Sequence, residues 1–186
     1  MRHVLAACLL VMLAACTKPT ADLELPVEPL GDFRLGFVEV AAPNLQQLLV
    51  SRDVPAEVLI EAVDRAMEAR FGRFLGGKVY HLAISIEGYS APPPLVPGKS
   101  AIVLRISVFD DAARARMADE PKLIYVIRVV EQRLSKSLDE VVQGLAEEAA
   151  RQTEIWLREQ QAGAGWFGGP GAGVPVAPER RGIAPP

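Results

Sequence analysis

Four carboxylates bracket one short, charged stretch of the chain, and they are the residues best suited to acid–base or calcium chemistry. They are Asp110, Asp111, Asp119 and Glu120. Paired carboxylates can serve as general acid and base, and carboxylate oxygens bind calcium. Their spacing matches no calcium-binding loop, however, and three basic residues lie in and beside the stretch. A solvated loop with neutralised charge is therefore the favoured interpretation.

His81 is a second candidate, because imidazole titrates near neutral pH and ligates metals. It lies on the more polar face of a predicted strand, where a surface histidine is favoured over a metal ligand. The sequence has no Gly-x-Ser-x-Gly motif, so no nucleophilic serine of that kind is expected. Gly76 and Gly77 follow a predicted helix, which disfavours a phosphate-binding loop. We expect no metal and no cofactor.

The two cysteines, Cys8 and Cys16, both lie near the N-terminus. Cys8 falls in an apolar run over residues 4–13, which follows a basic start at Arg2, and two alanines precede Cys16. A charged start, a short apolar run and small residues are typical of a secretory signal peptide. The run is too short for a transmembrane helix, which needs roughly 20 apolar residues.

The sequence Leu13-Ala14-Ala15-Cys16 resembles the lipobox of bacterial lipoproteins. The resemblance implies cleavage between Ala15 and Cys16 and attachment of lipid, with acyl chains such as palmitate, to the Cys16 thiol. Two or more acyl chains hold a protein firmly on a membrane, because each buried CH₂ contributes about 0.8 kcal/mol. Thr17 stands where similar lipoproteins of enteric bacteria carry Asp when they stay at the inner membrane. We therefore expect an outer-membrane anchor that faces the periplasm.

Hydrophobic periodicity predicts the elements that would position these residues. Strands are predicted over residues 33–41, 79–88, 101–109 and 123–130. Helices are predicted over residues 55–71, with Asp53 as cap, and from a capping box at Ser137 and Glu140 to about residue 160. The last strand is apolar almost throughout and is expected to be central or covered on both sides. The pattern predicts an α+β fold, in which an antiparallel sheet of about four strands carries two main helices on one face.

Composition divides the chain into four regions. They are a signal peptide (1–15), a lipidated N-terminus and tether (16–31), an α+β domain (32–161) and a disordered tail (162–186). Three prolines favour an extended tether, and the Gly/Pro-rich tail is poor in residues that form cores. The formal charge of −3 gives no reason to expect nucleic-acid binding.

Two segments offer candidate residues for binding a partner. The candidates are Tyr89, Leu95, Trp166 and Phe167. The first two flank or lie in a proline-rich loop, which is stiff enough to dock at little entropic cost but is also an ordinary hairpin connection. The aromatic pair in the tail is suited to a membrane interface or a partner groove, or belongs to an unstructured segment.

These observations favour a non-catalytic binding or assembly module, attached by lipid to the bacterial envelope and facing the periplasm, with an envelope protein as partner. The element order and compartment also resemble, weakly, the small α/β domains of periplasmic accessory lipoproteins, which serve transport or assembly machines. Two alternatives stay open. One is a subunit of an oligomeric secretion or transport machine, and the other is an envelope glycan or lipid hydrolase that uses the loop carboxylates.

Overall fold

A computed structural model describes residues 19–48, 50–128 and 136–169 of the chain. The predicted cleavage and lipidation sites, Ala15 and Cys16, lie outside the described residues, as does the tail from residue 170. None of the helices in the described part of the chain has the length and apolarity needed to cross a bilayer.

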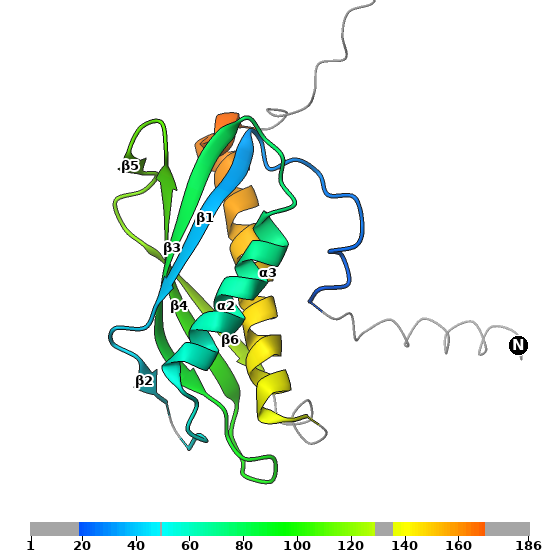
Figure 1. The fold of residues 1–186 in the computed structure, drawn as a ribbon, viewed down its shortest axis with the longest axis vertical. Coiled ribbons are helices and arrows are strands. Elements are labelled where there is room, and N and C mark those ends of the chain that lie inside the picture. Colours follow the sequence, from blue (N-terminus) through cyan, green and yellow to red (C-terminus); the bar gives the residue numbers. More distant parts are fainter. Residues whose placement is uncertain (1–18, 49, 129–135, 170–186) are drawn as a thin grey trace, which may run out of the picture.

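One six-stranded sheet forms one layer of the domain (Figure 1). Its strands are β1 (Phe33–Ala41), β2 (Gln46–Gln47), β3 (Lys78–Ser90), β4 (Ser100–Asp110), β5 (Ala115–Arg116) and β6 (Lys122–Arg128). The four long strands lie in the order β1-β3-β4-β6, while β2 pairs with β3 and β5 pairs with β4. Four long strands and two very short ones agree with the predicted number.

Two helices, α2 (Ala56–Phe71) and α3 (Leu138–Ala164), form the second layer and cover one face of the sheet (Figure 1). The α+β class with two main helices is confirmed. The capping box of α3 forms as predicted, because the Ser137 hydroxyl accepts from Glu140 N and the Glu140 carboxylate accepts from Ser137 N. Asp53 does not cap α2, whose N-cap residue is Pro55 and has no side-chain cap.

The sheet is mixed rather than wholly antiparallel. β3 pairs antiparallel with β4, and β4 with β6, but β1 and β2 run parallel to β3. The physical reason lies in the connection: α2 separates β1 from β3 in the chain, and a helical crossover returns the chain in the same direction. The expectation that residues 123–130 form a central or doubly covered strand is wrong, because β6 pairs with β4 alone among the described strands.

The predicted tail begins too early. Helix α3 continues to Ala164, and a short 3-10 helix, η3 (Trp166–Gly168), follows it. Phe167 is 1% exposed, and its ring meets Phe33 at 5.1 Å and Tyr80 at 4.8 Å between centroids. Trp166 and Phe167 therefore close one end of the hydrophobic core.

The predicted tether is also wrong for its described part, residues 19–31, here called the N-terminal segment. This segment runs along the helical layer to the start of β1 (Figure 1). Asp22 forms ion pairs with Arg70 at 2.9 Å and Arg73 at 3.0 Å, and Leu30 is fully buried. Charge pairing and apolar burial both hold the segment on the domain, which the count of its prolines did not reveal.

Candidate interaction surface

The face of the sheet opposite the helices, here called the open face, has no covering element among the described residues. From Tyr80 to Ile86 on β3 and from Ser100 to Val108 on β4 the side chains alternate, so that Leu82, Ile84, Leu104 and Ile106 pack under the helices. The intervening residues point to the open face. Three large apolar side chains stand out on the outer strands: Phe37 on β1, and Tyr125 and Ile127 on β6, are 52%, 57% and 60% exposed.

A bulge in β1 places Phe37 on the open face. The register of β1 against β3 shifts between Leu35 and Val38. Strict alternation from the fully buried Phe33 would put Phe37 in the core, because both have the same parity. An extra residue in the strand reverses that parity, so Val38 packs against the core and Phe37 points outward.

His81 lies beneath Phe37, and the two rings stack with centroids 4.0 Å apart and planes at 27°. Gly36 permits this arrangement, since a Cβ at that position would overlap the imidazole ring. The His81 Nε2 atom lies 3.1 Å from Asp111 Oδ1, while Nδ1 is buried and has no hydrogen-bond partner among the residues that the structure describes. Residues from β1, β3 and the end of β4 thus meet at one point on the open face.

A cavity of about 360 Å³ lies at this point. Its lining combines apolar side chains with a polar rim and consists of Phe37, Glu39, His81, Leu82, Ala83, Phe109, Asp110, Asp111 and Arg114. Phe109 is the cross-strand partner of His81 and adds a second aromatic ring to the floor. An apolar floor with a few polar groups at the rim is typical of a binding pocket.

A second apolar patch lies on β6, where Tyr125 pairs with Val103 and Ile127 with Ala101. The salt bridge between Arg105 and Glu87, at 2.8 Å, lies on the open face between this patch and the cavity. The Glu87 carboxylate accepts a hydrogen bond from the Arg105 guanidinium, and this hydrogen bond holds the pKa of Glu87 below its ordinary value. The open face therefore presents two apolar sites separated by one neutralised ion pair.

The lining of the cavity contains ionisable side chains but no nucleophilic hydroxyl or thiol among the described residues. No serine, threonine or cysteine occurs among the described residues that line it, so His81 has no hydroxyl or thiol there to activate. Asp110 accepts a hydrogen bond from Ala113 N at 2.9 Å, and Asp111 faces His81. Within the described ranges, no three His, Cys, Asp or Glu side chains come together in a way that could hold a metal ion.

The predicted partner-binding residues are scattered over the fold. Tyr89 is 3% exposed and its hydroxyl accepts a hydrogen bond from Val54 N at 3.0 Å, so it is a structural residue. Trp166 packs against Trp156, with ring centroids 5.7 Å apart, and is buried like its neighbour Phe167. Leu95 is 90% exposed on the proline-rich loop and is the one candidate of the four that a partner can reach.

Sequence reasoning missed Phe37, Tyr125 and Ile127. Gly36 in the middle of a strand was a usable signal, because an isolated glycine often marks a bulge. The apolar run of β6 predicts burial on both faces. A strand whose exposed apolar side chains bind a partner shows the same apolar run.

No protein-family model matches the chain, and no curated protein matches it. Among solved structures, the PelC dodecamer from Paraburkholderia phytofirmans is similar, with 13% identity and a TM-score of 0.40 over 68% of this chain and 91% of that chain. A Xanthomonas campestris protein of the family model DUF330 is 17% identical, with a TM-score of 0.39 over 73% and 87% of the two chains.

A minor lipoprotein from Acinetobacter baumannii is also similar, with 15% identity and a TM-score of 0.31 over 67% of this chain and 93% of that chain. Small α/β lipoproteins are thus among the similar structures. At such low identities and TM-scores, these likenesses say nothing about activity or partners.

Proposed function

We propose that this chain is a lipoprotein of the bacterial envelope, anchored by lipid on Cys16, that faces the periplasm from the outer membrane. In this proposal it is not an enzyme. It binds an envelope protein through the open face and so holds that partner at the membrane. The observation that carries the binding role is a sheet face that no described element covers and on which three large apolar side chains, Phe37, Tyr125 and Ile127, are at least half exposed.

Exposed apolar side chains gathered on one face usually mark an interaction site. The cavity beside Phe37 is suited to an apolar side chain of the partner, with His81, Asp111 and Arg114 at its rim to fix the orientation. The edge strand β6 adds a second mode of contact, because an unpaired strand edge accepts an extended segment through backbone hydrogen bonds. Together they favour a protein partner over a small molecule.

The anchor is supported by the leader sequence. A basic start, a short apolar run, two alanines and Cys16 follow in the order of a lipoprotein signal. Intact-mass measurement of protein extracted from bacterial membranes is expected to show a chain that begins at Cys16 with diacylglycerol and acyl additions. The Cys16→Ser protein is expected to lose these additions and to leave the membrane fraction. A wild-type chain without lipid contradicts the anchor.

The binding role is tested by affinity purification from detergent-solubilised envelopes, with a double variant, Tyr125→Ala and Ile127→Ala. A matched control is Leu75→Ala, which removes an 88% exposed leucine outside the open face. Exposed substitutions of this kind change stability by less than about 0.5 kcal/mol. We expect the partner with wild type and control but not with the double variant. Equal recovery by all three contradicts the proposal, and recovery of further copies of the chain itself favours the oligomeric alternative.

A further inference from the structure

An ion cluster ties the N-terminal segment to the helical layer. It consists of Asp22, Arg70, Arg73, Glu154 and Arg158. Arg70 donates to both oxygens of Asp22, at 2.9 and 3.0 Å, and also to the backbone oxygen of Pro19. Arg73 donates to Asp22 at 3.0 Å, so two guanidinium groups bind one carboxylate.

Helix α3 completes the cluster through Glu154, whose side chain is only 8% exposed. This carboxylate accepts from Arg70 at 2.8 Å, from Arg73 at 2.9 Å and from Arg158 at 2.9 Å. Burial of Glu154 acts to raise its pKa, but the hydrogen bonds from Arg70, Arg158 and Arg73 outweigh burial and hold the pKa below its ordinary value. The cluster therefore joins the N-terminal segment, α2 and α3 as ionised groups.

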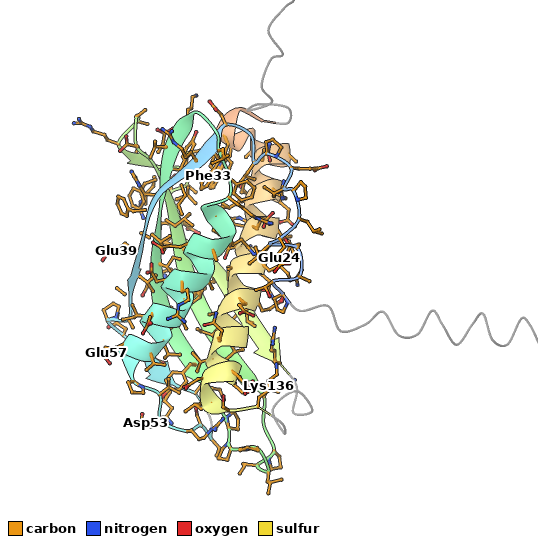
Figure 2. All side chains as sticks on the ribbon, turned by 45° about the vertical axis from the view of Figure 1, so that its right-hand side comes forward. Glu24, Phe33, Glu39, Asp53, Glu57 and Lys136 are labelled. Atoms are coloured by element: carbon orange, nitrogen blue, oxygen red, sulfur yellow. The ribbon has the colours of Figure 1, made fainter. Side chains whose placement is uncertain are left out.

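A second contact fixes the direction of the segment. Arg158 also donates to the backbone oxygen of Glu28 at 3.0 Å. The segment is thus attached to the helical layer near both of its ends, to Arg70 of α2 at one end and to Arg158 of α3 at the other, before Leu30 enters the core. Figure 2 shows Glu24, in the middle of the segment, beside α3, and Glu39 of β1 on the other side of the molecule.

The short stretch of chain between Cys16 and the attached segment limits where a lipid on Cys16 can lie. Pro19 lies three residues after Cys16, and three extended residues span at most about 11 Å. A free tether over residues 16–31 would instead allow about 50 Å between lipid and domain. The bound segment removes most of that freedom, so a lipid on Cys16 lies close to the helical layer.

Resting on the lipid anchor proposed above, we infer that the ion cluster holds the helical layer against the membrane and turns the open face toward the periplasm. Two exposed apolar side chains on the helical side, Leu25 at 62% and Ile155 at 44%, are suited to contact the boundary between headgroups and acyl chains. Ile155 lines a cleft of about 500 Å³ together with Pro19 and Asp22, next to the point where the anchor arrives. In this arrangement the bilayer covers the helical layer, and the partner binds the open face.

Quenching of fluorescent labels by nitroxide-bearing lipids tests this orientation in vesicles that carry the lipidated protein. No cysteine follows Cys16, so Ile155→Cys and Tyr125→Cys each provide a single free thiol for the label. We expect strong loss of fluorescence for the label at position 155 and little loss at position 125. Equal quenching at the two positions, or stronger quenching at 125, overturns the inference.

A variant that releases the N-terminal segment tests whether the ion cluster causes the orientation. With Asp22→Ala the difference between the two labels is expected to disappear, because the segment becomes a long tether. The control Glu61→Ala removes an exposed Arg65–Glu61 pair on α2 and is expected to keep the difference. Persistence of the difference in a folded Asp22→Ala protein, checked by its thermal unfolding, overturns the role of the cluster.

The same vesicles separate this inference from the anchor. Mass spectrometry of the preparation shows whether Cys16 carries lipid. A chain without lipid refutes the proposed function and the inference with it. A lipidated, vesicle-bound chain with equal quenching refutes the orientation alone.

Discussion

Phe167 provides the sharpest test of how the C-terminal part of the fold is built. A disordered tail from residue 162 predicts that Phe167→Ala leaves stability unchanged. In the structure, Phe167 is 1% exposed and meets the rings of Phe33 and Tyr80. Its backbone oxygen also accepts a hydrogen bond from Asp32 N at 2.7 Å, so residues distant in the chain meet there. The substitution is therefore expected to open a cavity in the core.

The magnitude follows from the buried area. A phenylalanine buries about 150–250 Å², which at about 25 cal/mol per Å² corresponds to roughly 4–6 kcal/mol as an upper bound. Core Phe→Ala substitutions cost about 3–5 kcal/mol. We therefore expect Phe167→Ala to lower the free energy of unfolding by about 4 kcal/mol, and Tm by roughly 8–16 °C for a domain of this size.

Urea and thermal unfolding of the domain from residue 19 onward measure both quantities. Phe37→Ala is the matched control, since it removes the same side chain from a site that is 52% exposed. We expect the control to lose no more than about 1 kcal/mol, mainly from its stacking on His81. A loss below about 1 kcal/mol for Phe167→Ala, or equal losses for the two variants, refutes the assignment of Phe167 to the core.

Three further predictions concern the polar contacts. Arg70 holds the pKa of Asp22 at about 2, below its ordinary value of 3.8, so the contribution of this pair is complete above pH 3.8 and is lost as the pH falls toward 2. Because the Asp22 side chain is 47% exposed and screened, acid titration is expected to lower the free energy of unfolding by about 1 kcal/mol more in the wild type than in Asp22→Asn. Glu154→Ala leaves the buried Arg70 with one carboxylate fewer, and chemical denaturation is expected to show that the free energy of unfolding falls by about 3 kcal/mol. A fall below about 1 kcal/mol contradicts a stabilising role of the cluster. Tyr89→Phe leaves Val54 N without its acceptor and is expected to cost about 1 kcal/mol in the same assay, whereas no change would mean that this bond is not formed.

The regular elements were predictable because their signals are local. Alternation located β3 and β4 within about a residue or two at each end, and the Ser137–Glu140 box located the start of α3. Such patterns report which face of an element is apolar. They do not report what covers that face, and for this reason the apolar run at residues 123–130 predicts a strand that is central or covered on both sides, whereas β6 is exposed.

The remaining features depend on contacts between residues distant in the sequence. Arg70 contacts both Asp22 and Glu154, which stand 48 and 84 residues away from it in the chain. Nothing in the composition of residues 17–31 indicates that pairing, and the prolines of this segment predict an extended tether. In the same way, Trp166 and Phe167 stand among glycines, and only the position of Phe33 and Tyr80 shows why they are buried.

The most direct measurement of the central claim is photocrosslinking in intact bacteria. A photoreactive phenylalanine analogue replaces Phe37 or Tyr125 on the open face, and Val58 on α2 or Ile155 on α3 on the helical side. All four sites are more than a third exposed, so accessibility alone does not distinguish them. The account predicts one discrete protein adduct from positions 37 and 125 that is missing at 58 and 155. The same adduct at all four positions, or adducts from the helical side alone, would contradict it.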